Sequence, residues 1–274
     1  MLVGHKDKVD IFKKLIESNG LAHGYLLFGE SSVGKFLFAK SLANFLENHQ
    51  FEEPEHPLKE VLILAPEDGS IGINPIRDAK QFLSRKPVLS SRRVLIIDEA
   101  EAMTNQAQNA VLKLAEEPPE NSLIIIITSG LEAILPTLKS RLQKIYFLRL
   151  KSSEIEKLLL KKYGLSAPKA KSLAESSFGK PGLAVRSLDN SVVKEAEKLA
   201  DNLFKNLSEK RKIIEEVVKD GQLMNEFLIK VITRLSRDPI KNVQVLSKIM
   251  DRMVKMSDFT TNKRLQLESA LWNI

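Results

Sequence analysis

Two hydrophobic patterns alternate along the first 150 residues of the chain. Short, continuous apolar runs are typical of buried parallel strands, and we expect strands at residues 23–28, 61–64, 94–99, 123–129 and 144–148. Longer stretches with apolar residues three and four positions apart predict helices at residues 9–18, 36–46, 74–85, 101–116 and 136–142. Strands that alternate with helices predict an α/β fold with a doubly wound, mainly parallel sheet.

The strand pattern stops after residue 150, and only helical periodicity follows. Residues 152–163, 167–176 and 179–188 predict three short helices, which would form a small helical lid. Residues 191–274 predict about five further helices, with breaks near residues 207–208, 220–221, 238–239 and 258–260. We therefore expect a core over residues 1–150, a lid over residues 151–190 and an all-α C-terminal domain over residues 191–274.

The segment between the first strand and the second helix fits the phosphate-loop pattern GxxxxGK[ST] at every fixed position except the last. In such a loop, backbone N–H groups cradle phosphate oxygens, the lysine reaches the β- and γ-phosphates and the hydroxyl holds Mg²⁺. Phe36 takes the place of that hydroxyl residue and has no oxygen to offer. The candidate nucleotide-binding residues of this loop are Gly29, Ser31, Ser32, Val33, Gly34, Lys35 and Phe36.

Polar residues follow two later strands. The strand at 94–99 ends in Asp98 and Glu99, and the strand at 123–129 carries Thr128 near its end. After a phosphate loop, such an aspartate orients Mg²⁺ and the adjacent glutamate polarises the attacking water. The alternative is two surface carboxylates at a strand end. Thr128 is a candidate sensor of the γ-phosphate, although a threonine at a strand end is common.

The amino-acid composition limits which metal sites and partners the chain can have. The 274 residues include no cysteine and four histidines, so disulfides and thiolate-bound metals are excluded and we expect no metal site. The net charge is +7, and the basic excess lies in residues 151–274. It indicates either an anionic partner such as nucleic acid or simply solvated helix faces. The chain shows no export signal and no apolar run long enough for a membrane span, so we expect a cytoplasmic location and no membrane partner.

Several motifs together resemble those of the bacterial clamp-loader AAA+ family. Residues 109–119 (NAVLKLAEEPP), followed by an apolar strand and then Ser140-Arg141, are similar to the NALLKxLEEPP and SRC elements of that family. Gly4-His5 and residues 23–29 match the family's opening. The resemblance covers residues 1 to about 188 and implies an AAA+ P-loop core, a helical lid and a C-terminal helical collar that mediates oligomerisation.

Within this family the chain is more similar to the delta-prime branch than to the ATP-hydrolysing gamma/tau branch. Phe36 replaces the Mg²⁺-binding hydroxyl, and Gly182 stands where the motor subunits carry their sensor-2 arginine. The four-cysteine zinc module of many members is replaced by residues 47–60, so the resemblance implies no zinc here. Lys35, Asp98 and Glu99 are retained, with Glu99 as a vestigial base, so ATP binding is expected to be weak and its Mg²⁺ dependence doubtful.

The resemblance also implies a role for Arg141 as an arginine finger that enters the ATP site of a neighbouring subunit. The alternative is a surface arginine at a helix end. The implied function is that of a non-motor DNA polymerase III clamp-loader subunit, with gamma/tau and delta subunits, the sliding clamp and primed DNA as partners. Lys80 and Arg85, on one outer helix face, are candidate contacts for DNA phosphates. A hydrolysing gamma-type ATPase and a P-loop regulator outside replication remain alternatives.

Overall fold

The computed structural model describes residues 4–67, 69–189, 191–205, 210–256 and 263–271. These residues form two compact units, Met1–Ala184 and Val185–Ile274. Residues 151–184 group with the core in the first unit, and the finer division into core, lid and C-terminal domain stays a prediction. Residue 190, at the predicted boundary, lies outside the described residues.

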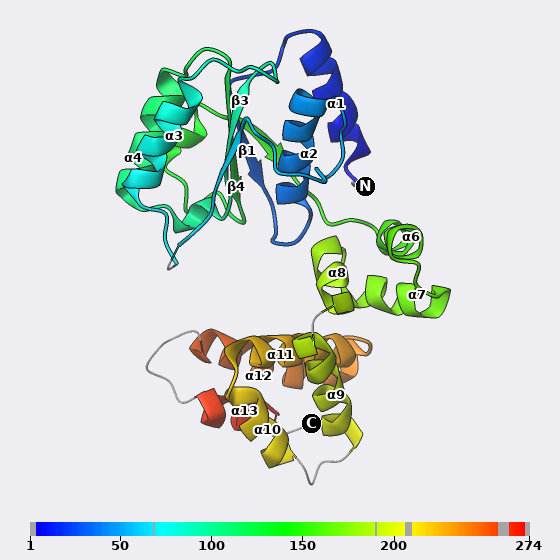
Figure 1. Ribbon diagram of the computed structural model, residues 1–274. Coiled ribbons are helices and arrows are strands. Elements are labelled where there is room, and N and C mark those ends of the chain that lie inside the picture. The colour runs from blue at the N-terminus through cyan, green and yellow to red at the C-terminus, as the bar shows by residue number, and fades with distance from the viewer. Residues whose placement is uncertain (1–3, 68, 190, 206–209, 257–262, 272–274) are drawn as a thin grey trace. The chain divides into compact units, whose positions relative to one another are not determined.

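The first unit is built on a parallel sheet. In the part of the chain that the structure describes, five strands lie in the order β2-β3-β4-β1-β5, and every neighbouring pair is parallel (Figure 1). The strands are β1 (Gly24–Phe28), β2 (Val61–Leu64), β3 (Arg93–Ile97), β4 (Ser122–Thr128) and β5 (Gln143–Tyr146). The predicted α/β class and the parallel sheet are confirmed, and β1 lies between β4 and β5.

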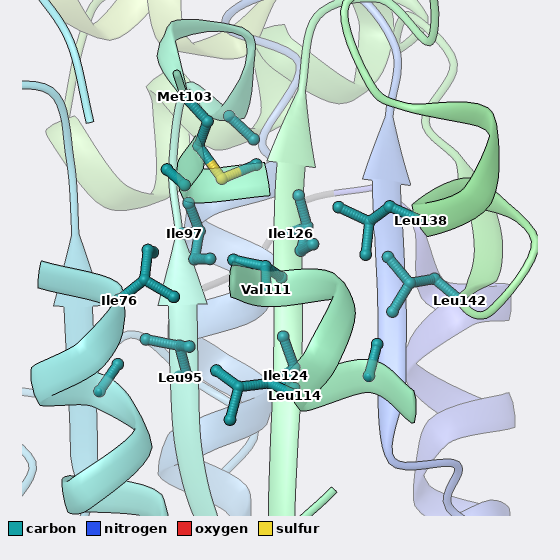
Figure 2. Close-up of a cluster of buried hydrophobic side chains, with 14 of the residues drawn as sticks. Ile76, Leu95, Ile97, Met103, Val111, Leu114, Ile124, Ile126, Leu138 and Leu142 are labelled. Atoms are coloured by element: carbon teal, nitrogen blue, oxygen red, sulfur yellow. The ribbon is translucent and has the colours of Figure 1, made fainter. Parts of the chain in front are cut away.

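Helices cover both faces of this sheet. In Figure 1, α1 (Lys6–Glu17) and α2 (Lys35–Asn48) lie on one face, and α3 (Ile73–Leu83) and α4 (Asn105–Glu116) lie on the other. This arrangement explains why β4 is apolar at consecutive positions, since alternate side chains of a strand point to opposite faces. Ile124 and Ile126 pack with α3 and α4 in the cluster that Figure 2 shows, and Ile125 and Ile127 pack with α1 and α2.

Two predicted helices are shorter than expected. The helix predicted over residues 101–116 begins at Asn105, because Thr104 caps it by accepting a hydrogen bond from the Ala107 N–H at 3.1 Å. Residues Ala100–Ala102 instead form a short 3₁₀ turn, η1. The helix predicted over residues 136–142 is α5 (Pro136–Lys139), and the chain enters β5 four residues later.

A buried carboxylate, Glu60, closes the loop that precedes β3. Its oxygens accept hydrogen bonds from the N–H groups of Val88, Leu89 and Ser90 at 2.5–3.2 Å, and from the Ser90 hydroxyl at 2.7 Å. Burial raises the pKa of Glu60, but these hydrogen bonds to the charged form outweigh burial and leave the pKa below its ordinary value of 4.5. The ionised carboxylate therefore stabilises the fold.

Glu60→Gln is expected to lower the free energy of unfolding by about 1.5–3 kcal/mol at pH 7, because hydrogen bonds to a charged group are lost. The contribution is present above pH 4.5 and is lost as the pH falls through the lowered folded pKa, so the variant and the parent should converge in acid. Urea unfolding at pH 7, and then at stepwise lower pH for as long as the parent stays folded, measures both the loss and the convergence. The exposed Glu55→Gln is the control, and an equal loss in both variants would contradict the prediction.

Helices make up the rest of the described chain. The lid helices are α6 (Ser152–Tyr163), α7 (Ala167–Ser176) and the start of α8 (Pro181–Asp189). In the described residues beyond 190, the five predicted helices are α9 (Ser191–Lys205), α10 (Lys210–Val218), α11 (Gly221–Leu235), α12 (Pro239–Met256) and α13 (Lys263–Leu271). Phe227, Leu203 and Val231 are fully buried members of their core.

Two of the four predicted helix breaks fall where described helices end. The breaks near residues 220–221 and 238–239 are confirmed, whereas those near 207–208 and 258–260 lie outside the described residues. No helix within the described ranges is both long and apolar enough to cross a membrane.

Candidate functional site

The candidate phosphate loop lies between β1 and α2, as its motif requires. Ser32 has φ 64° and Gly34, which caps α2, has φ 104°, so both residues take left-handed backbone conformations. Left-handed turns of this kind direct successive N–H groups toward one side of a loop. The loop follows the end of β1 and therefore sits at the carboxyl edge of the sheet, where ligands of open parallel sheets bind.

Lys35 is buried and points back into the loop. Its Nζ donates hydrogen bonds to the carbonyl oxygens of Gly29 at 2.5 Å and Glu30 at 2.6 Å. Burial lowers the pKa of Lys35, while the nearby carboxylates of Glu101 and Asp98 oppose the change. A phosphate bound by Lys35 would therefore have to replace two carbonyl partners that the loop itself supplies.

Of the carboxylates after β3, Asp98 and Glu101 lie near enough to interact with the charge of this lysine. Asp98 is partly buried, and burial raises its pKa although its Oδ1 accepts a hydrogen bond from the Glu99 N–H at 3.0 Å. Glu99 takes a left-handed conformation, with φ 47° and ψ 48°, and its side chain is exposed. The structure thus brings Asp98 toward Lys35, and the turn at Glu99 leads into η1.

Glu101 is a third carboxylate in this region, which the sequence reasoning missed. It accepts hydrogen bonds from the Ser129 hydroxyl at 2.5 Å and from the Ser129 N–H at 3.3 Å. Thr128, the predicted sensor, is buried, and its hydroxyl donates to the Gly130 carbonyl oxygen at 2.7 Å. Ser129, directly after β4, is exposed, and the role of Thr128 as a sensor stays a prediction. A serine adjacent to Thr128 was the available signal.

Phe36 has a packing role in place of the missing hydroxyl. Its ring is partly buried against the hydrophobic cluster that includes α1 and α2, and the Lys40 Nζ lies 5.6 Å from its ring centroid. A cation over an aromatic face is attracted by the ring quadrupole. The side chain at this position therefore presents carbon and not oxygen to its surroundings.

Gly182, at the start of α8, lies directly on the phosphate loop. Its N–H donates a hydrogen bond to the Ser32 carbonyl oxygen at 3.0 Å. A Cβ atom at residue 182 would lie 3.0 Å from the Ser32 Cβ and 3.1 Å from the Ser32 oxygen. A side chain at residue 182 would therefore press on Ser32, which would have to shift by a few tenths of an ångström. The hydrogen bond of the Gly182 N–H joins the lid to the loop through backbone atoms.

Glu30, at a position that the motif leaves variable, forms ion pairs with residues from two other segments. The Arg149 guanidinium holds its carboxylate with Nε at 2.6 Å and Nη2 at 2.8 Å, and the Lys180 Nζ lies at 2.7 Å. Arg149 and then Lys180 lower the pKa of Glu30 to about 2. Sequence reasoning missed this cluster because its members are far apart along the chain.

Arg141 lies between α5 and β5, and its partners come from α4, from α5 and from Ser140, which directly follows α5. Its guanidinium pairs with Glu116 at 2.7 Å and donates to the Thr137 carbonyl oxygen at 2.8 Å and the Ser140 hydroxyl at 3.3 Å. The side chain is 38% exposed. Lys80 and Arg85 are also exposed, Lys80 on α3 and Arg85 two residues after the end of that helix.

Residues 4–151, more than half of the chain, match the family described as "DNA polymerase III, delta subunit". Among curated proteins, the chain is 32% identical over 154 residues to DNA polymerase III subunit gamma/tau of Mycobacterium bovis, covering 51% of this chain and 27% of the relative. It is 30% identical over 159 residues to DNA polymerase III subunit delta' of Bacillus subtilis, covering 53% of this chain and 48% of the relative. The aligned region thus spans at most about half of these relatives.

Solved structures support the fold. A DNA polymerase III gamma subunit-related protein of Thermotoga maritima superposes with a TM-score of 0.58 at 23% identity, covering 96% of this chain and 97% of that one. The Holliday junction branch migration motor RuvB of the same organism gives a TM-score of 0.55 at 16% identity, covering 85% of this chain and 76% of that one. The predicted AAA+ fold, with a helical C-terminal part, is confirmed.

Proposed function

Because the chain belongs to the DNA polymerase III delta subunit family and is related to clamp-loader subunits, we propose that it acts as a non-motor, delta-prime-type subunit. In this proposal, Arg141 completes the ATP site of a neighbouring motor subunit. The chain's own loop serves mainly as a structural element. The assembly uses ATP hydrolysed at the motor sites to place a sliding clamp on primed DNA.

The observation that carries the proposal is the contact of Gly182 with Ser32. By family resemblance, motor subunits place an arginine at this position, where it would meet the γ-phosphate. Here the Gly182 N–H is bonded to the loop, and a Cβ atom would already be within 3.1 Å of Ser32. A larger residue at this position therefore presses on Ser32, and the loop lacks the hydroxyl that would hold Mg²⁺ for hydrolysis.

The same loop supports only weak ATP binding in this proposal. Lys35 and Asp98 could still contact a triphosphate, with Glu99 as a vestigial base. However, the Lys35 Nζ is held by two loop carbonyls, and Phe36 offers no oxygen to Mg²⁺. Nucleotide would have to displace existing hydrogen bonds without the metal contact that usually strengthens binding.

The proposed partners follow from the family. Gamma/tau and delta subunits would join the chain through its C-terminal helices, which would form part of the collar, and the sliding clamp and primed DNA would be engaged through the complex. Lys80 and Arg85 are the proposed contacts for DNA phosphates, because both side chains are exposed.

The purified chain alone is expected to hydrolyse ATP at no more than background rate, and Lys35→Ala should not change that rate. Phe36→Thr should also leave turnover at background, because restoring the hydroxyl does not supply an arginine at position 182. Steady-state phosphate release measures all three proteins.

Robust turnover by the unmodified chain that Lys35→Ala abolishes would favour the alternative, a hydrolysing gamma-type ATPase. That alternative draws on the similarity to gamma/tau proteins and on the retained Lys35, Asp98 and Glu99. A regulator outside replication would instead fail to assemble with clamp-loader subunits in a reconstitution.

A further inference from the structure

The lid of the first unit is attached to the phosphate loop through charged groups that belong to neither the catalytic motif nor the trans arginine. Glu30 belongs to the loop, Arg149 to the segment between β5 and α6, and Lys180 is the residue just before α8. The Arg149 fork binds both carboxylate oxygens of Glu30, and Lys180 binds one of them. Paired contacts from a planar guanidinium fix orientation as well as distance.

Backbone contacts hold the lid segment on either side of Lys180. Gly179 has φ 77°, and a Cβ atom there would lie 2.6 Å from the Leu150 carbonyl oxygen. The Leu150 N–H donates to the Gly179 carbonyl oxygen at 2.8 Å, and the Gly182 N–H donates to the Ser32 carbonyl oxygen at 3.0 Å. Residues 179–182 are therefore packed against the segment between β5 and α6 at one end and against the phosphate loop at the other.

We propose that Glu30 is a built-in anionic latch that fixes residues 179–184 of the lid on the phosphate loop. The carboxylate pairs with the two cations beside the loop, Arg149 and Lys180, which a nucleotide phosphate could otherwise bind. The lid position is then set by the chain's own charge, and no ligand is required for it. This inference concerns the conformation of the first unit and goes beyond the proposed role in clamp loading.

The latch can be tested by hydrogen–deuterium exchange of the full chain at pH 7 in low salt, without nucleotide or partner proteins. Glu30→Gln is expected to speed exchange of the amides in residues 179–184 about fivefold, which is the scale of a partly exposed ion-pair cluster. Exchange of the Gly182 N–H reports directly on the contact between lid and loop, because this N–H donates a hydrogen bond to the Ser32 carbonyl oxygen of the loop. In 1 M salt the parent and the variant should converge, because the screening length shortens to about 3 Å.

Glu53→Gln is a matched control. Glu53 also pairs with a lid lysine, Lys162 of α6, at 3.2 Å, and its side chain is exposed to a similar degree as that of Glu30. Its replacement should leave exchange at residues 179–184 unchanged. The proposal would be overturned if residues 179–184 exchanged equally fast in the parent and in Glu30→Gln. It would also be overturned if Glu30→Gln and Glu53→Gln accelerated their exchange equally.

Lys180→Gln provides a second route to the same contact should Glu30→Gln fold poorly. The single Lys180→Gln variant should also accelerate exchange at residues 179–184. In the double variant, Glu30→Gln should add less than it does alone, because the two residues share one interaction. Fully additive effects would contradict the latch. Since no nucleotide or partner enters the assay, its result is independent of whether the proposed function holds.

Discussion

Arg141→Ala is expected to slow ATP hydrolysis at the neighbouring motor site of a reconstituted clamp-loader complex by a factor on the order of 10³ or more. A guanidinium supplied in trans stabilises charge that develops on the transferred phosphoryl group. The Arg141 side chain is 38% exposed, and its present partners are Glu116, Thr137 and Ser140. Because a surface ion pair contributes only ~0–1 kcal/mol, Glu116 can release the guanidinium to a phosphate at small cost.

The measurement is clamp- and DNA-stimulated phosphate release by complexes that contain the parent chain or a variant. Arg141→Lys keeps the charge but loses the planar fork, so it should restore only a small part of the activity. Lys144→Ala removes an exposed cation three residues away and should behave like the parent. Size-exclusion chromatography establishes that each complex has assembled. Unchanged turnover by the assembled Arg141→Ala complex would show that the trans role is wrong.

The sheet could be predicted from sequence because both of its faces are covered. Ile124 to Ile127 are all buried, with neighbouring residues packed on opposite faces, so the strand appears as a continuous apolar run. The start of a helix is harder to predict where a capping residue lies inside a stretch that has helical periodicity. Thr104 is a strong capping residue, and its hydroxyl starts α4 after η1 although residues 101–103 suit a helix.

The candidate site could be predicted only where its residues follow a fixed spacing. Lys35 belongs to a local motif, and Asp98 follows an apolar strand, so a linear pattern identifies both. The cluster of Glu30, Arg149 and Lys180 depends on how the lid folds onto the loop, and no local pattern encodes that. Glu101 was missed for a similar reason, because the chain turns at the left-handed Glu99 and brings Glu101 to the end of β4.

Gly29→Ala is expected to destabilise the first unit by about 3–5 kcal/mol, through left-handed strain together with a backbone clash. Gly29 has φ 137°, and a Cβ atom there would lie 2.4 Å from the Phe147 carbonyl oxygen. The Phe147 N–H also donates to the Phe28 carbonyl oxygen at 2.8 Å, so the obstructing backbone is held beside β1. The clash therefore cannot be relieved by turning a side chain.

Gly34→Ala is the matched variant, because this second motif glycine has φ 104° but a Cβ atom there would meet no other atom within 4 Å. Only the conformational cost of about 1–2 kcal/mol is therefore expected. Urea unfolding can be followed through Tyr25, Tyr146 and Tyr163, which all lie in the first unit. Equal losses in the two variants would mean that backbone conformation alone requires both glycines. A larger loss at Gly29 would mean that packing against Phe147 requires this glycine, so its presence in the motif does not by itself indicate nucleotide binding.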